Sequence, residues 1–334
     1  MQKNYGHGYK TRVFITGVSG FIGSSLATKL IEDGYEVGGL LRWSPRVAVN
    51  AEPLKGKVKL YQGNLNDYAN LSFILKDFQP DYVFHLGAIS PVSYSFTHPQ
   101  EVTEVNYMGT INLAEACKTL LPNLKKFIFA STMEIYGIQD PNNGAFDEDT
   151  TVPVPHSPYA VAKYATELYL KHLYLAYGYP IVIARGSNTF GRTTDKYFVI
   201  EATINRMLDT LYLGKSGAIN MGNPIPVRSY IHINDVVAFY QAIMESDNEK
   251  IFGESFNTGP ANGCSVKELV ERIAKIIGWN GQINWNTTEL RAGEIMYLNT
   301  KNEKAKIFLG WTPSLTLEEG LKLAVGNWKD QRKK

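Results

Sequence analysis

Four polar side chains, carried by two short segments, could act together on one small carbohydrate. Thr132 and Glu134 follow the apolar run 127–130, whose β-forming residues predict a buried strand. An extended backbone beyond that strand would point both side chains the same way. Tyr159 and Lys163 lie four residues apart behind a Ser-Pro helix start, so they share one helical face. A hydroxyl, a carboxylate, a phenol and an ammonium at one place predict an enzyme.

Alternating strands and helices over the first 190 residues or so must position these groups. Strands are expected at 13–17, 36–41, 58–61, 82–86, 127–130 and 181–184, and helices at 24–33, 101–120 and 158–177. A strand, helix, strand order repeated in this way predicts the α/β class with a doubly wound parallel sheet.

The pattern changes after residue 188, where loops lengthen and helices at 266–277 and 317–328 appear without strict alternation. We therefore expect a dinucleotide-binding domain formed by residues 1–187 plus 229–262. Residues 188–228 plus 263–334 are expected to form a smaller substrate-binding domain.

A glycine-rich loop at 17–23 joins the first strand to the first helix. Glycines there permit a tight turn and close backbone approach to a pyrophosphate, and the helix N-terminus offers N–H groups to the anion. With the strand and helix order, the spacing G-x-x-G-x-x-G predicts a Rossmann-type dinucleotide site. The expected cofactor contacts here are Gly17, Ser19, Gly20, Phe21, Ile22 and Gly23, with Leu65, Leu86, Tyr159 and Lys163 elsewhere.

The residue at the tip of the second strand bears on which dinucleotide binds. An acidic residue there would accept hydrogen bonds from the ribose of NAD, but this chain has Arg42 and no acid. A guanidinium suits a 2′-phosphate, which favours NADP, with NAD as the alternative. Arg42 could also merely solvate the strand end. Asn64 could hydrogen-bond the adenine, and a turn role for it is equally compatible with the sequence.

Composition excludes several other classes of protein. The chain has 334 residues, of which 44% are hydrophobic and 20% charged, as in soluble globular proteins. Its net charge of +2 gives no reason to expect nucleic acid or an anionic membrane as a partner. No stretch approaches the roughly 18 to 20 apolar residues of a membrane span. Two distant cysteines argue against a disulfide framework or a metal site, and we expect a cytoplasmic protein.

The glycine loop and the Tyr159 and Lys163 pair together resemble the extended short-chain dehydrogenase/reductase family. The likeness is closest to its nucleotide-sugar branch. Further matching segments are H-L-G-A at 85–88, where the branch usually has a second alanine in place of Gly87, N-Y-M-G-T at 106–110, R-S-Y-I-H-I-N-D at 228–235, R-A-G-E at 291–294 and L-G-W-T-P at 309–313.

One stretch separates the reactions within that branch. Residues 130–137 are similar to the A-S-T-S-E-x-Y/F-G stretch of GDP-mannose 4,6-dehydratases, whereas epimerases usually have serines and no glutamate there. Met133 departs from glucose-type dehydratases, which have an aspartate at that position. The resemblance implies an NDP-hexose 4,6-dehydratase with a GDP-mannose-like substrate as first choice. The alternative is a 4-epimerase or another nucleotide-sugar modifier that uses only the Tyr159 hydride step.

The resemblance also implies a role for each polar group. Tyr159 has an ordinary pKa of ~10, and both the Lys163 ammonium and an oxidised nicotinamide should lower it, so that the phenolate can take a sugar proton with help from Thr132. Glu134 would then take the C5 proton, although it could instead cap the strand or form an ion pair.

Binding of the nucleotide diphosphate is assigned by resemblance to Asn188, Arg228 and Arg291, although the two arginines could also be ordinary surface cations. The helices 101–120 and 158–177 would pair with their copies, which implies a homodimer or homotetramer.

Overall fold

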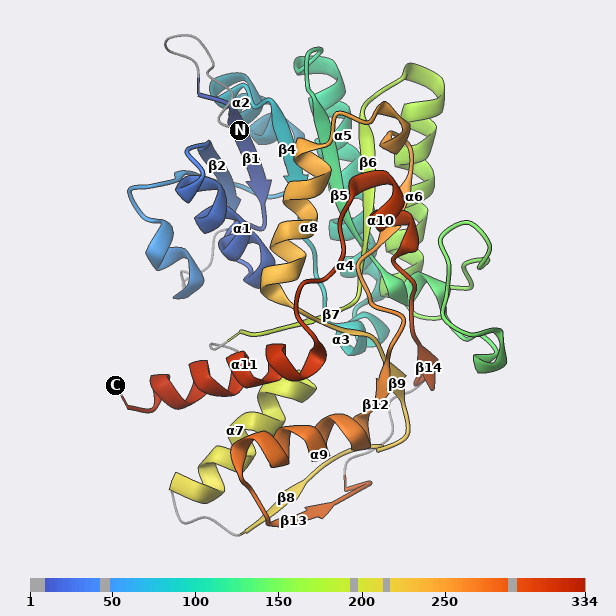
Figure 1. The fold of residues 1–334 in the computed structure, drawn as a ribbon. Coiled ribbons are helices and arrows are strands. Elements are labelled where there is room, and N and C mark those ends of the chain that lie inside the picture. The colour runs from blue at the N-terminus through green and yellow to red at the C-terminus, as the bar shows by residue number, and fades with distance from the viewer. Residues whose placement is uncertain (1–9, 43–48, 193–197, 213–216, 288–292, 334) are drawn as a thin grey trace. The chain divides into compact units, whose positions relative to one another are not determined.

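A seven-stranded parallel sheet forms the centre of the fold in the computed structural model, which describes residues 10–42, 49–192, 198–212, 217–287 and 293–333 (Figure 1). The strand order is β11-β6-β5-β4-β1-β2-β3, and the sequence order of the first strands reverses beside β1. Its strands are β1 (Arg12–Thr16), β2 (Glu36–Leu41), β3 (Lys59–Gln62), β4 (Tyr82–His85), β5 (Lys126–Thr132), β6 (Ile181–Gly186) and β11 (Ser255–Asn257). The doubly wound α/β fold expected from the sequence is confirmed.

Contacts divide the chain into two compact units. Unit 1 comprises residues 1–130, 165–183 and 243–254, and unit 2 comprises residues 131–164, 184–242 and 255–334. The two binding domains expected from the sequence, which have other boundaries, remain a prediction.

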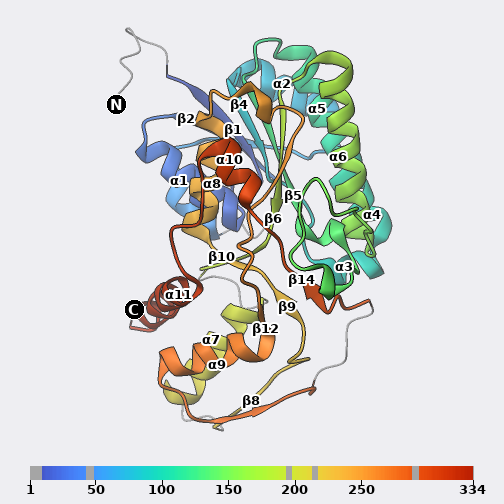
Figure 2. The ribbon, with the colours of Figure 1, turned by 45° about the vertical axis from the view of Figure 1, so that its right-hand side comes forward.

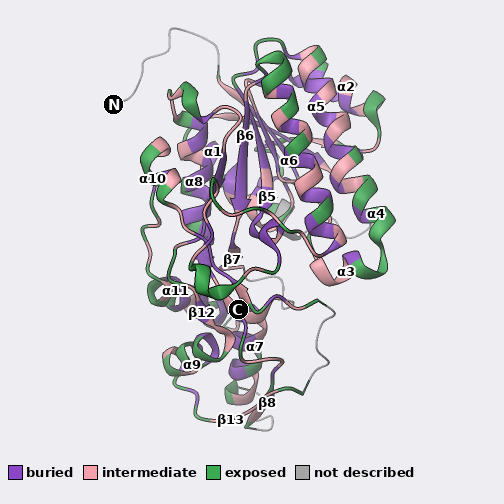
Figure 3. Ribbon diagram, turned by 90° about the vertical axis from the view of Figure 1, so that its right-hand side faces the viewer, coloured by how far each residue is buried: buried purple, intermediate pink, exposed green. Residues whose placement is uncertain are grey.

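Unit 1 contains most of the sheet and the helices that cover it. In Figures 1 and 3, α1 lies on one face of these strands, and α2 and α5 lie on the other. The inner strands are largely buried because they carry apolar runs; Val13, Phe14 and Ile15 of β1 are 0% exposed, whereas the edge strand β3 is exposed or half-buried. The helices are α1 (Phe21–Glu32), α2 (Tyr68–Phe78), α3 (Val92–Thr97), α4 (Pro99–Thr103), α5 (Gly109–Leu120) and, mostly in this unit, α6 (Pro158–Tyr177).

Unit 2 has its own core, built largely from helices. Ile204, Leu208, Val270, Ile273 and Leu321 are buried in it, and α7 and α9 lie side by side in Figure 2. The helices of this unit are α7 (Val199–Tyr212), α8 (Ile233–Glu245, whose last turn belongs to unit 1), α9 (Val266–Ile277), α10 (Glu303–Leu309) and α11 (Leu317–Gln331). Short strands complete the unit, namely β7 (Asn188–Phe190), β8 (Ala218–Asn220), β9 (Val227–Arg228), β10 (Tyr230–His232), β12 (Cys264–Ser265), β13 (Gln282–Asn284) and β14 (Tyr297–Leu298).

The helix expected at 101–120 is less regular than its sequence suggests. A π-helical segment, η2 (Glu104–Met108), separates α4 from α5. The carbonyl of Asn106 accepts hydrogen bonds from the hydroxyls of Thr110, at 2.6 Å, and Thr166, at 3.2 Å. These side-chain donors replace part of the regular helical hydrogen bonding, which stabilises the wider turn.

Within the described residues, the helices are all too short or too polar to cross a bilayer.

Candidate active site

Thr132 lies at the end of strand β5, and Glu134 lies in the short helical turn that Thr132 caps. The strand ends at Thr132, and the 3-10 turn η3 (Met133–Tyr136) begins immediately after it. The Thr132 hydroxyl oxygen accepts the backbone N–H of Glu134 at 3.2 Å. The prediction of an extended backbone beyond the strand is therefore wrong, because the threonine side chain caps a helical turn by accepting the Glu134 amide instead. The two side chains still come from positions two apart, at the cap and the second residue of this turn.

Helix α6 brings Tyr159 to the same turn. Ser157 caps this helix by accepting the N–H of Ala160 at 3.1 Å, which fixes Tyr159 in the first turn. Tyr159 is 8% exposed and hydrogen-bonds the Thr132 hydroxyl, which is 7% exposed. Lys163, one helical turn further on, is 3% exposed.

The Tyr159 phenol is a weaker acid in the protein alone than the sequence suggested. Burial raises its pKa, the nearby Glu134 carboxylate raises it further, and the hydrogen bond with Thr132 opposes them. The net direction is opposite to the lowering expected from the Lys163 ammonium. The reason is that burial removes the solvent that would stabilise a phenolate, which the sequence alone does not reveal.

Buried hydrogen bonds of Tyr136 also stabilise the η3 turn. The Tyr136 hydroxyl donates to Asn257 Oδ1 at 2.9 Å and accepts from Arg185 Nη1 at 2.9 Å. Tyr136 is 0% exposed and packs its ring against Phe146, 5.4 Å away between centroids. Sequence reasoning missed these residues, although Tyr136 lies within the stretch that carries Glu134.

A second carboxylate supports this network. Glu148 Oε1 accepts the backbone N–H of Asn257 at 2.7 Å. Burial raises the Glu148 pKa to about 7, against the opposing backbone hydrogen bond. Its position in a loop between η3 and α6 gave no sequence signal of burial.

The glycine loop of unit 1 has the close packing that a dinucleotide site requires. Gly17 has φ +69°, and a Cβ there would lie 2.9 Å from the Gly87 Cα. A Cβ on Gly23 would lie 2.2 Å from the Gly17 carbonyl oxygen. Gly20 precedes α1 and provides no side-chain cap. Backbone N–H groups in the first turn of α1 can therefore donate hydrogen bonds to an anion. Close glycine packing and a helix N-terminus without a side-chain cap are the features that a pyrophosphate site uses.

Other residues expected to contact the cofactor lie at the start of α1 and directly after β4. Ser19, Phe21 and Ile22 are half-buried around the start of α1. Leu86 donates its N–H to the Thr16 carbonyl at 3.3 Å, directly after β4. Contact of these residues with a cofactor remains a prediction.

Arg42, Asn64 and Leu65 lie at the ends of β2 and β3. Arg42 is exposed. A hydrogen bond with Glu101 raises the pKa of Tyr94, and the positive charge of Arg42 partly opposes that rise. Asn64 Oδ1 accepts the N–H of Asn66 at 3.1 Å, so the turn role weighed for it is present. Leu65 is buried, and its carbonyl accepts from Asn112 Nδ2 at 3.2 Å.

The expected diphosphate-binding residues belong to unit 2. Asn188, half-buried in β7, donates from Nδ2 to the Ser229 carbonyl at 3.3 Å. Arg228, in β9, donates to the Val227 carbonyl at 2.9 Å and to the Ile295 carbonyl at 2.5 Å. Arg291 lies outside the described residues.

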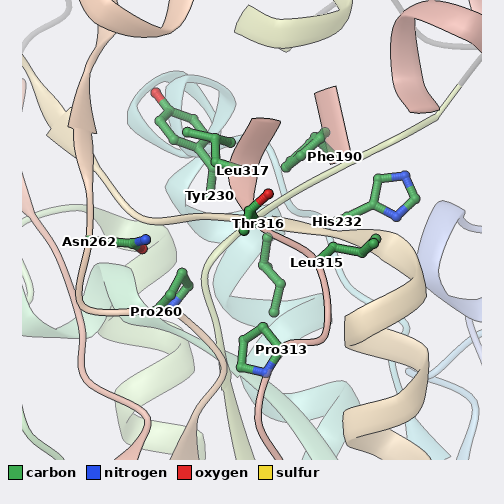
Figure 4. A pocket seen from close by; sticks show the side chains of 10 residues that line it. Phe190, Tyr230, His232, Pro260, Asn262, Pro313, Leu315, Thr316 and Leu317 are labelled. Carbon is green, nitrogen blue, oxygen red and sulfur yellow. The ribbon is translucent and has the colours of Figure 1, made fainter. Parts of the chain in front are cut away.

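A separate pocket in unit 2 lies between β10 and the start of α11 (Figure 4). Its lining includes Phe190, Tyr230, His232, Pro313 and Leu315. Burial lowers the pKa of His232, and the described residues that line the pocket include no Lys, Arg, Asp or Glu. This described lining offers no cation to a diphosphate.

Comparison with known proteins relates this geometry to established families. A family model described as GDP-mannose 4,6 dehydratase matches residues 14–324. The chain belongs to this family. Its relatives include a GDP-mannose 4,6-dehydratase of Vibrio cholerae, 30% identical over 354 residues that cover 93% of this chain and 91% of the relative. A UDP-glucose 4-epimerase of Mycolicibacterium smegmatis is likewise 30% identical, over 319 residues that cover 94% of this chain and 97% of the relative.

Solved structures similar to this member of the GDP-mannose 4,6-dehydratase family include two epimerases. The UDP-glucose 4-epimerase of Thermotoga maritima with UDP-glucose is 32% identical, with a TM-score of 0.86, covering 97% of this chain and 100% of that chain. The UDP-glucuronic acid 4-epimerase of Bacillus cereus, in complex with UDP-glucuronic acid and NAD, is 28% identical, with a TM-score of 0.84, covering 96% and 100%. The chain is thus an enzyme of the nucleotide-sugar dehydratase and epimerase group.

Proposed function

We propose that the protein is an NDP-hexose 4,6-dehydratase whose first-choice substrate is GDP-mannose-like. The observation that carries this proposal is the Glu134 carboxylate beside the Tyr159 phenol. Its charge is close enough to raise the pKa of that phenol, and its backbone is tied to Thr132. A 4-epimerase needs an acid–base group only at C4, whereas a dehydratase needs a second one for the neighbouring carbon.

The residues divide the reaction between them. A nicotinamide cofactor, when bound, supplies the chemistry of accepting a hydride from the sugar and returning it. Tyr159 Oη takes the proton of the sugar 4-hydroxyl, and the Thr132 hydroxyl orients the phenol through their hydrogen bond. Removal of that proton with the C4 hydride leaves a 4-ketone, which makes the C5 hydrogen acidic.

Glu134 carries the second half of the proposed reaction. Its carboxylate takes the C5 proton and gives it to the hydroxyl that leaves C6 as water. The hydride would return to C6 from the bound cofactor, and C5 would take a proton from solvent. One water is lost and no net oxidation occurs, so the atoms and electrons balance.

For the cofactor we propose NADP, with NAD as the alternative. The exposed guanidinium of Arg42 at the end of β2 supports this choice, since it can pair with a 2′-phosphate. Replacing Arg42 by Ala should weaken NADPH binding about tenfold or more and leave NADH binding nearly unchanged. Equal losses for the two cofactors would contradict the preference for NADP.

A UDP-glucose 4-epimerase is the second candidate, supported by relatives of that name at 30% and 32% identity. The two reactions differ in product mass. Incubation of the full-length protein with GDP-mannose, dTDP-glucose and UDP-glucose should give, for one of them, a product that has lost one water. A product of unchanged mass would favour the epimerase.

A variant separates the two candidates further. Glu134→Gln removes the proposed C5 base and keeps the side-chain shape. A dehydratase should form the 4-keto intermediate and then stall, whereas an epimerase should keep most of its turnover. Asp140→Asn, an exposed site after the η3 turn, serves as the control for loss of a negative charge.

A further inference from the structure

A chain of buried hydrogen bonds centred on His85 links the ends of β1 and β4 within unit 1. His85 is 1% exposed. Its Nδ1 lies 2.7 Å from the Thr16 hydroxyl oxygen, and its Nε2 lies 2.8 Å from the Thr110 hydroxyl oxygen. The Phe129 ring stacks on the imidazole with centroids 5.8 Å apart, and the Phe127 ring lies 6.1 Å away. The imidazole is thus packed on its faces and hydrogen-bonded at its edge.

The direction of every hydrogen bond in this chain follows from its end. The Asn106 carbonyl can only accept, so the Thr110 hydroxyl donates to it at 2.6 Å. The Thr110 oxygen must then accept the N–H of His85 Nε2. In the neutral imidazole the other nitrogen, Nδ1, is the acceptor, so it takes the hydrogen of the Thr16 hydroxyl. The Thr16 oxygen in turn accepts the backbone N–H of Gly87 at 3.0 Å.

One end of this chain reaches the glycine loop, and the other reaches the backbone of the segment after β4. Thr16 immediately precedes Gly17, and a Cβ on Gly17 would lie 2.9 Å from the Gly87 Cα. At the far end, the Asn106 side chain donates to the Ile89 carbonyl at 2.9 Å and accepts the Ile89 N–H at 2.8 Å. The network therefore ties the segment after β4 to both the β1 end and η2. These side-chain hydrogen bonds add to the backbone bond from the Leu86 N–H to the Thr16 carbonyl, so side chains and backbone together hold the loop against that segment.

We infer that His85, held as the Nε2–H tautomer, is a positioning residue that sets the width of the dinucleotide site through Thr16 and Thr110. This inference rests on the proposed function, because it requires that the glycine loop bind NADPH or NADH. It gives the histidine no role in proton transfer to the sugar.

Isosteric variants test the network. Thr16→Val and Thr110→Val each remove one hydroxyl of the chain. Thr166→Val is the matched control, because its hydroxyl also donates to the Asn106 carbonyl, at 3.2 Å, but lies outside the path through His85. Thr16→Val and Thr110→Val should raise the Kd of the full-length protein for NADPH about tenfold. Their Kd for GDP or UDP, whichever the wild-type protein binds, should not change.

The control should keep wild-type Kd values for both probes. Loss of affinity for NADPH and for the nucleoside diphosphate together would overturn the inference, since it would indicate general damage to the fold. Unchanged NADPH affinity in both variants would also overturn it. If the wild-type protein binds neither NADPH nor NADH, the proposed function fails first, and the inference fails with it.

A spectroscopic measurement on the wild-type protein does not depend on the variants folding. In the protein labelled with ¹⁵N-histidine, the His85 resonances are assigned by their loss in His85→Asn. The ring should show a hydrogen on Nε2 and a bare Nδ1. A hydrogen on Nδ1 with a bare Nε2 would reverse both hydrogen bonds of the imidazole and overturn the inference.

Discussion

The Thr132 hydroxyl accepts the backbone N–H of Glu134 at 3.2 Å and also hydrogen-bonds the Tyr159 phenol. One side chain therefore positions both the carboxylate and the phenol on which the proposed reaction depends. A small displacement of Thr132 would move both groups together.

The electrostatic coupling of Glu134 and Tyr159 predicts a shift in pH dependence. The Glu134 carboxylate raises the pKa of Tyr159, because a negative charge disfavours the phenolate. Glu134→Gln removes that charge, so the pKa should fall and more phenolate should be present at a given pH. In single-turnover measurements of the C4 oxidation, the alkaline rise in rate should move to lower pH. A shift to higher pH would contradict the coupling.

A second pH effect concerns stability and originates at Glu148. Burial raises its pKa from 4.5 to about 7, so the folded protein binds this proton more tightly than the unfolded chain does. The resulting stabilisation is complete below pH ~4.5 and is lost as the pH rises through 7. Wild-type protein should lose about 1–3 kcal/mol of unfolding free energy relative to Glu148→Gln between pH 4.5 and 8.

Urea unfolding of both proteins across this range measures the Glu148 effect. Glu303→Gln, at an exposed helical position, is the control and should follow the wild-type curve. If the unfolding free energy of the wild-type protein instead rises relative to that of Glu148→Gln as the pH increases, the pKa of Glu148 is not raised in the folded protein.

The turn and strand at the candidate site show what the sequence could and could not predict. The polar residues at 132 and 134 and the pair at 159 and 163 were identifiable from spacing and motif. The sequence predicted that an extended backbone brings Thr132 and Glu134 together. This prediction was wrong, because a 3-10 turn capped by Thr132 follows the strand instead. Local spacing cannot distinguish these two backbones, because both bring residues two apart near each other.

Contacts between residues far apart in the sequence could not be predicted for a different reason. The Tyr136 hydroxyl meets Asn257, 121 positions away, and the Asn106 carbonyl meets Thr166, 60 positions away. Neither pairing has a periodic signal, and the π-helical segment at Asn106 depends on such contacts. By contrast, the parallel sheet was predictable, because its buried strands carry uninterrupted apolar runs.

The glycine loop should not tolerate a side chain at Gly23. A Cβ there would lie 2.2 Å from the Gly17 carbonyl oxygen, so Gly23→Ala must displace the loop. We expect NADPH affinity to fall at least about tenfold in fluorescence titrations. Gly326→Ala is the matched control, since a Cβ there has nothing within 4 Å. Wild-type affinity in Gly23→Ala would show that the loop does not hold the cofactor.

The exposed face of α6 predicts self-association. Val161, Leu168 and Leu175 are 51%, 54% and 80% exposed and recur every seven residues, so they form one apolar stripe. We expect the wild-type protein to sediment as a dimer or tetramer at micromolar concentration and Leu168→Glu to sediment as a smaller species. Ile307→Glu, at a 76% exposed position on α10, should leave the assembly unchanged. A monomeric wild-type protein would contradict this prediction.

Solvent deuterium in the product tests the role of Glu134 most directly. Turnover of the accepted NDP-hexose in D₂O, followed by mass spectrometry and NMR of the sugar, reports whether C5 exchanged. We expect a 4-keto-6-deoxy product with deuterium at C5 from the wild-type protein and no such product from Glu134→Gln. A wild-type product that keeps its C5 hydrogen and both C4 and C6 oxygens would contradict it.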